Sequence, residues 1–121
     1  MYSLEPKTQG STLSLLLTGD VLMEDVVSFN NTMRDYSKQP GISQLVLNLS
    51  EVGKMDQAGL GVLVSLHTSM QRYGRRLVLM QISPTVDQAL KKAEIEGFFP
   101  VCENEEELKG FIGETARKPK N

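Results

Sequence analysis

Few residues of this chain belong to the types that carry out catalysis or bind metals. His67 is the only histidine and Cys102 the only cysteine among 121 residues. A Ser-His-Asp triad would have to be built around His67, and the sequence cannot supply a Cys/His metal cluster or an internal disulfide. His67 falls on an apolar helical stripe and is expected to be packed or half-buried, and Cys102 is expected to act as a small hydrophobe. With no phosphate-cradling Gly-Lys loop either, we expect no enzymatic activity and no cofactor.

Two aspartates occupy positions that could serve phosphate chemistry. In a receiver-type domain an aspartate at a strand end accepts a phosphoryl group, and Mg²⁺ is held there with the help of an acidic pair after an early strand. After the early strand the sequence offers only Asp20, so the required second acid is missing. Asp56 is predicted to lie seven residues beyond Leu49, the last residue of its strand. The sequence therefore disfavours a phosphoacceptor aspartate, which stays a third hypothesis.

Composition limits the classes of protein to which the chain can belong. Charged residues make up 23% of the sequence and hydrophobic residues 40%, with a net charge of −2. These values predict one globular domain over residues 1–116 and a frayed basic tail over 117–121. A nucleic-acid partner would need a basic face, and apolar runs such as residues 15–17 are too short to cross a bilayer. No signal peptide is recognised, so we expect a cytoplasmic protein without direct membrane insertion.

The apolar pattern predicts strands that alternate with helices. Strands are expected at residues 11–18, 42–49, 77–82 and 98–102, with a further edge strand at 2–8. Helices are expected at residues 24–38, from Asp56 to Gly74, from Ser83-Pro84 to Ala93, and at 104–113. Such alternation requires crossover connections and predicts a largely parallel sheet. Three arginines beside Gly74, at positions 72, 75 and 76, are expected to lie in a solvated loop.

The stretch from Leu45 to Val64 contains the most informative spacing. A seven-residue connection over residues 50–56 is predicted between the strand and the next helix, with Met55 tucked beneath it. Asp56 is placed to cap that helix by accepting hydrogen bonds from the N–H groups near Ala58 and Gly59. Gly59 and Gly61 each cost a helix about 1 kcal/mol relative to alanine. They therefore indicate close packing of the backbone or the approach of a partner.

These residues resemble the central motif of the STAS domain family, specifically of the bacterial anti-sigma factor antagonists. The matching residues are Asn48-Leu49-Ser50 and Met55-Asp56 followed by Gly59-Leu60-Gly61-Val62-Leu63. Weaker similarities in the same order are Leu17-Thr18-Gly19-Asp20, Ile82-Ser83-Pro84 with Val86, and Glu96-Gly97-Phe98. The resemblance implies a single-domain α/β fold of the STAS type, with a mostly parallel sheet of 4–5 strands and about four helices.

The resemblance also implies a switch. Antagonists of this family dock on an ATP-binding anti-sigma factor that is also a serine kinase, and docking releases a sigma factor. The kinase phosphorylates the serine after the motif aspartate, and the phosphorylated antagonist no longer binds. Here that position is Gln57, followed by Ala58, so no phosphorylation is expected at the family position. Leu22 is a second departure, because it stands where the family carries an acid.

From this resemblance we predict a docking surface at the ends of two strands and the start of the following helix. Its members are Asp20, Lys54, Met55, Asp56, Gln57, Ala58 and Gly59. The hydroxyls of Ser50, Thr68 and Ser69 could replace the missing phosphosite, but plain polar surface is the simpler interpretation. The alternative function is that of a cytoplasmic STAS accessory subunit of a membrane transporter, such as a lipid exporter. The oligomeric state stays open.

Overall fold

The chain is built around a five-stranded sheet with the strand order β1-β2-β3-β4-β5. The structure is a computed structural model that describes residues 1–109. The strands are β1 Tyr2–Gln9, β2 Thr12–Val21, β3 Gln44–Met55, β4 Arg76–Met80 and β5 Val101–Cys102. β1 is antiparallel to β2 and the other neighbours are parallel. The predicted STAS-type α/β fold with a mostly parallel sheet is thus confirmed, including the edge strand that contains Pro6.

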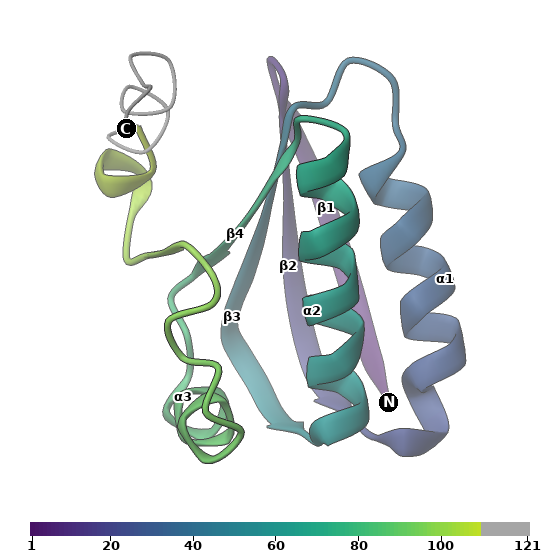
Figure 1. The fold of residues 1–121 in the computed structure, drawn as a ribbon, viewed down its shortest axis with the longest axis vertical. Coiled ribbons are helices and arrows are strands. Elements are labelled where there is room, and N and C mark those ends of the chain that lie inside the picture. Colours follow the sequence, from purple (N-terminus) through teal and green to yellow (C-terminus); the bar gives the residue numbers. More distant parts are fainter. Residues whose placement is uncertain (110–121) are drawn as a thin grey trace.

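Helices connect the parallel strands and cover the sheet. They are the 3₁₀ turn η1 Met23–Asp25 and the helices α1 Val26–Ser37, α2 Gln57–Arg72 and α3 Pro84–Lys92. Figure 1 shows α1 and α2 side by side in front of the sheet, with α3 beyond the far side of α2. Within residues 1–109 there is no helix with the length and apolar character needed to cross a bilayer.

The core lies mainly between the sheet and the helices. Leu15, Leu47 and Leu79 from three neighbouring strands are fully buried there, together with Phe29 of α1 and Leu63 of α2. A smaller cluster covers the other face of β4 and consists of Val46, Val78, Met80, Cys102 and Leu108. β4 is therefore buried on both faces, as its nearly all-apolar sequence predicts.

Two strands extend further than the sequence predicts. β2 was expected to stop at Gly19-Asp20 but continues to Val21, and β3 was expected to end at Leu49 but continues to Met55. The predicted connection over residues 50–56 is therefore wrong. Residues 51, 52 and 55 still pair with β2 across a register shift. Val52 and Met55 are buried there, and Gly19, with a φ of 102°, lets β2 follow the bend.

The predicted helix ends are largely confirmed. Ser83 caps α3 by accepting a hydrogen bond from Val86 N at 3.3 Å, with Pro84 next in sequence. α2 ends before Gly74, whose φ of 71° suits glycine. The last strand is shorter than predicted, because Phe98 is exposed and only residues 101–102 pair with β4. Residues 105–109 are helical and Asn104 lies in the bend before them, while residues 110–113 of the predicted helix and the tail 117–121 lie outside the described residues.

Candidate functional site

The ends of β2 and β3 are joined by a side chain. Asp20 Oδ1 accepts a hydrogen bond from the backbone N–H of Lys54 at 2.9 Å, and Val21 O accepts one from Asp56 N at 3.2 Å. Gly53 lies against this contact: a Cβ there would be 2.5 Å from Asp20 Oδ1. The glycine leaves room for the carboxylate, which fixes Lys54 at the edge of the predicted docking surface.

Asp56 caps α2 as the sequence predicts. Its Oδ1 accepts hydrogen bonds from Ala58 N at 3.1 Å and Gly59 N at 3.2 Å, and its backbone is extended. These bonds satisfy two of the N–H groups that have no partner within the helix. Asp56 therefore has a structural function at the point where β3 turns into α2.

The start of α2 is packed tightly against the two strand ends. A Cβ on Gly59 would lie 2.9 Å from Met55 Cγ and 3.1 Å from Val21 Cγ1. Met55 and Gly59 are both buried. The close packing inferred from the glycine is confirmed at Gly59. At Gly61 no atom lies within 4 Å of the added Cβ, so there only the other alternative, the approach of a partner, stays open.

The seven predicted residues come together, but they do not all reach the surface. Lys54 and Gln57 are exposed, while Asp20, Asp56 and Ala58 are partly buried. Met55 and Gly59 lie beneath them in the core. Any partner would therefore touch Lys54, Gln57 and the edges of the three partly buried residues. Met55 and Gly59 can only support these residues from below.

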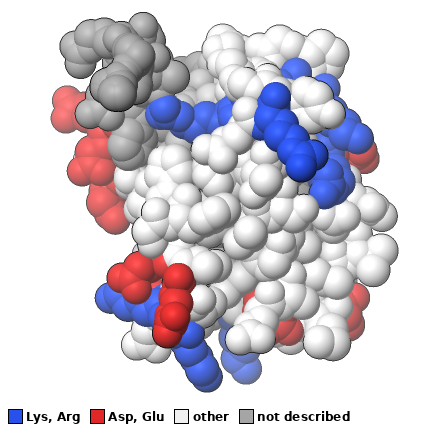
Figure 2. Space-filling model, in the orientation of Figure 1, with Lys and Arg blue, Asp and Glu red and all other residues white. Residues whose placement is uncertain are grey.

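A shallow groove that the sequence analysis missed begins at Gln57. It has a volume of about 360 Å³ and is lined by Gln57, Leu60, Gly61, Val64, Ser65, Ala93 and Ile95. From Gln57 to Gln71 the helix contains no Asp, Glu, Lys or Arg, and Figure 2 shows a broad uncharged area over this face of the molecule. Depletion of charge is typical of the centre of protein–protein interfaces. In the sequence, only Gly61 indicated this groove. Ala93 and Ile95 could not be predicted, because the tertiary fold brings them next to α2.

The alternative phosphorylation sites differ in their surroundings. Ser50 is exposed, and Asn48 Oδ1 accepts hydrogen bonds from both its backbone N and its Oγ, at 2.9 and 2.7 Å. Thr68 donates to Val64 O at 3.1 Å within α2, and Ser69 is partly buried. Ser50 thus helps to order the turn of β3, and Thr68 is bonded to its own helix.

The residues with catalytic potential are held in the interior. His67 is 4% exposed and lies against the rings of Phe98 and Phe99, with ring centroids 5.0 and 5.5 Å away. Burial lowers its pKa. Burial, followed by the charges of Glu107 and Glu103, raises the pKa of Cys102 to about 11. The expectations of a packed histidine and of an apolar cysteine are confirmed. Within residues 1–109 no three His, Cys, Asp or Glu side chains form a metal site.

One argument against a phosphoacceptor aspartate has to be corrected. Because β3 continues to Met55, Asp56 does follow directly on a strand end. What still opposes a receiver-type site is the local bonding. Asp56 Oδ1 is held by the α2 cap, and Asp20 Oδ1 accepts from the backbone of Lys54. Each carboxylate therefore bonds to backbone N–H groups, and these bonds do not direct the two carboxylates toward a shared cation site.

Comparison with known proteins gives one family and several similar structures. The STAS domain family model matches residues 3–108. The Thermotoga maritima protein TM1081 is 19% identical with a TM-score of 0.81, covering 92% of this chain and 95% of that one. An anti-sigma factor antagonist from Mycobacterium paratuberculosis is 11% identical with a TM-score of 0.80, covering 94% and 96%. Phosphorylated Bacillus SpoIIAA is 19% identical with a TM-score of 0.67, covering 93% and 99%. At these identities the likeness is one of fold.

Proposed function

The chain belongs to the STAS domain family, and from this premise we propose that it is a regulatory protein-binding module of the anti-sigma factor antagonist type. Its partner would be an ATP-binding anti-sigma factor with serine kinase activity, and docking would release a sigma factor. No catalysis, cofactor or nucleic acid is involved in this proposal, and its setting is the cytoplasm.

The observation that carries the proposal is the position of Gln57. It is exposed as the first residue of α2, directly after the Asp56 cap. In the antagonists that the sequence resembles, the residue at this position is the phosphorylated serine. An amide accepts no phosphoryl group from a serine kinase, and Ala58 offers no second hydroxyl. The docking surface would thus persist while the kinase could not switch it off.

The uncharged groove next to Gln57 supports the same placement of the partner. It would extend the contact from the polar end of α2 along its exposed face toward Ile95. A polar rim beside an apolar centre is the usual arrangement in protein interfaces. Lys54 and Gln57 would form the rim, and Gly61 and Val64 the centre, with the buried Leu60 beneath them.

The alternative partner is a membrane transporter. The absence of a hydroxyl at residues 57 and 58 favours this alternative, because a transporter accessory subunit has no need of the kinase site. Both candidates would use a STAS surface for binding, so the identity of the captured protein separates them.

The test is a pull-down from the native host with the tagged full chain, with and without ATP, followed by mass spectrometry of bait and prey. We expect a small ATP-binding kinase as prey and an unmodified bait in both conditions. The Gln57→Ser variant should be captured equally without ATP and become phosphorylated with ATP. Recovery of a transporter ATPase, or a phosphate on Ser50, Thr68 or Ser69 of the wild-type bait, would contradict the proposed mechanism.

A matched pair of variants tests where the partner binds. Gln57→Asp places a second negative charge beside Asp56, and Gln88→Asp does the same beside Asp87 at an exposed position of α3. We expect the first substitution to weaken capture by about tenfold, as like charges at an interface do, and the second to leave it unchanged. Equal capture of both variants would remove the partner from the start of α2.

A further inference from the structure

A second cavity lies at the opposite end of α2. It has a volume of about 440 Å³ and opens between the carboxyl-terminal ends of α1 and α2. Its lining residues are Ser37, Lys38, Ser69, Met70, Tyr73 and Arg75. A volume of this size falls within the range of sites for small molecules. No part of the proposed docking surface contributes to it.

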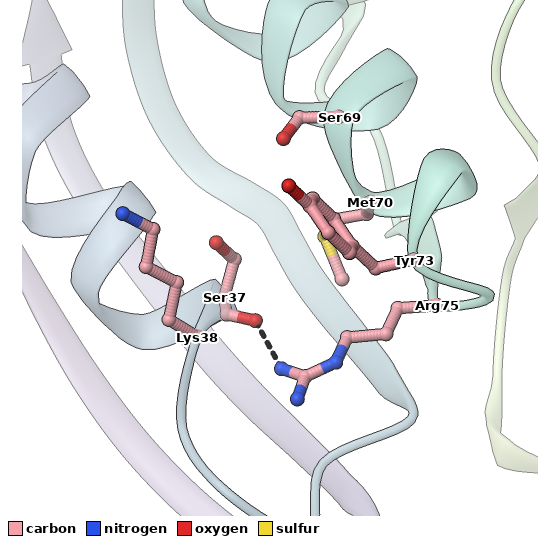
Figure 3. Close-up of a pocket in the computed structure, with 6 residues that line it drawn as sticks. All are labelled: Ser37, Lys38, Ser69, Met70, Tyr73 and Arg75. Atoms are coloured by element: carbon pink, nitrogen blue, oxygen red, sulfur yellow. Dashed lines mark hydrogen bonds between the residues drawn. The ribbon is translucent and has the colours of Figure 1, made fainter.

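The polar groups around this cavity are mainly hydrogen-bond donors. Figure 3 shows the hydroxyls of Ser69 and Tyr73 on the α2 side of the space and Ser37 and Lys38 on the α1 side, with the ammonium of Lys38 turned back over α1. The Ser37 hydroxyl already donates to Arg34 O at 2.8 Å. No carboxylate is among the lining residues. A hydroxyl can donate or accept, whereas an ammonium or guanidinium only donates. The group that satisfies this set best is an acceptor with several lone pairs.

Arg75 offsets the negative end of α1, which would otherwise repel an anion. Its Nη1 donates hydrogen bonds to Ser37 O and to Gln39 O, the latter at 3.2 Å, so it caps the end of α1. The expectation that Arg75 lies in a solvated loop is therefore wrong. With this end neutralised, the charge of Lys38 is left for a ligand. Figure 2 shows blue Lys and Arg side chains gathered over this end of the molecule.

The cavity also has an apolar part. The side chain of Met70 is 2% exposed and lies among the lining residues as a part of the core. Tyr73 is 78% exposed, which is a high value for an aromatic residue that lines a cavity. A ligand that covered this ring would remove apolar surface from water, which is favourable.

We propose that the cavity between the ends of α1 and α2 binds a small organic anion, with a phosphate or carboxylate held by Lys38 and the hydroxyls of Ser69 and Tyr73, and an apolar or aromatic part against Tyr73 and Met70. Arg75 is a positioning residue, because its hydrogen bonds hold the end of α1 in place. The site is separate from the docking surface, which lies at the start of α2. If no anion bound at this cavity, the proposed docking function would be unaffected.

Phenyl phosphate and benzoate are suitable probes, because each joins an anionic group to an aromatic ring. The measurement is a titration of the full ¹⁵N-labelled chain followed by amide chemical shifts at constant ionic strength. We expect saturable shifts at the amides of Lys38, Ser69 and Tyr73 with at least one of the two anions. The relative affinities would tell whether phosphate or carboxylate is the preferred group. Benzyl alcohol, which keeps the ring without the charge, should give no saturable shifts.

Variants decide whether the shifts report on this cavity. Lys38→Gln should reduce the affinity for the bound anion about tenfold, the effect of losing one charge-assisted hydrogen bond. Tyr73→Ser should weaken it as well, and Lys7→Gln on the exposed edge strand β1 should not change it. Unchanged melting temperatures would show that the variants are folded. Non-saturable shifts with both anions, or equal affinity in Lys38→Gln and Lys7→Gln, would overturn the proposal.

Discussion

Asp20 at the end of β2 and Lys54 at the end of β3 are joined by a hydrogen bond in which the carboxylate accepts the backbone N–H at 2.9 Å. The bond lies where the register between the strands shifts, between Gly19 and Val21. A side chain thus replaces a ladder hydrogen bond that the backbone cannot form there. The contact lies at the end of β3, two residues before Asp56 caps α2.

Asp20→Ala should loosen this junction without unfolding the domain. The loss of one hydrogen bond at a partly exposed site is expected to lower the free energy of unfolding by about 1 kcal/mol. The amide hydrogen of Lys54 should then exchange about fivefold faster or more, as measured by NMR. Asp20→Asn is the matched control, since its amide oxygen can still accept the bond. Equal exchange at Lys54 in wild type and Asp20→Ala would show that the bond does not hold the strand ends together.

The burial of His67 predicts that stability depends on pH. Burial lowers the pKa of His67 below its ordinary value of 6.5, so between these two values the unfolded chain binds a proton that the folded chain does not. The contribution of His67 to the free energy of unfolding should therefore be constant above about pH 7. It should fall as the pH drops below about 6.5. His67 is the only histidine in the sequence, so its imidazole signals can be titrated directly by NMR.

His67→Leu is the control for this pH dependence. It removes the titrating group and also the buried Nδ1, which has no hydrogen-bond partner. Urea midpoints measured at pH 5.5 and pH 7.5 should differ in the wild type and differ less in the variant. An imidazole that titrates at or above 6.5 in the folded protein would contradict the assignment.

Cys102 provides a probe of local opening. It is 1% exposed, and burial is the main reason why its pKa rises to about 11. Because the thiolate is the reactive form, a disulfide reagent at pH 8 should label the folded protein far more slowly than the unfolded one. Labelling should speed up with increasing urea and follow the unfolding transition. Rapid labelling of one equivalent in native buffer would show that the β4–β5 edge opens readily.

The sequence predicted local features better than it predicted how far elements extend. Asp56 and the Ser83-Pro84 pair were recognised as helix starts because capping depends on a few neighbouring residues. The ends of β2 and β3 were placed too early, because Gly19, Asp20 and Gly53 are typical of turns. In the fold these residues form a bend that the Asp20–Lys54 bond holds within the sheet. The pairing of β2 with β3 determines where these strands end, and a local sequence pattern does not predict such pairing.

In the candidate site, too, local features were predicted and long-range contacts were not. The order of residues 54–59 gave the cap, the buried glycine and the exposed Gln57. The groove needed Ala93 and Ile95 from beyond α3, and the cavity between α1 and α2 needed Arg75 to reach Ser37 and Gln39. These contacts join residues about 30 to 40 positions apart and depend on how the helices pack.

Gly59 and Gly61 form a natural pair for separating packing from binding. Both lie within α2, where alanine is intrinsically more favourable than glycine by about 1 kcal/mol. At Gly59 the added methyl would contact Met55 and Val21 closely, and overpacking of this kind costs about 1–3 kcal/mol. At Gly61 the methyl meets no atom within 4 Å. Gly59→Ala should therefore be destabilised overall, and Gly61→Ala should be stabilised by up to about 1 kcal/mol, or about 4 °C in Tm.

The same pair tests whether the groove contacts the partner. The methyl of Gly61→Ala would partly fill the groove beside Gln57, so this variant should be more stable and yet bind the captured partner more weakly. Thermal unfolding and quantitative pull-down on the same preparations give both values. A gain in stability with unchanged binding would confine the docking surface to the start of α2. A Gly61→Ala variant less stable than the wild type would show that the exposed face of α2 is packed more closely than its open surroundings indicate.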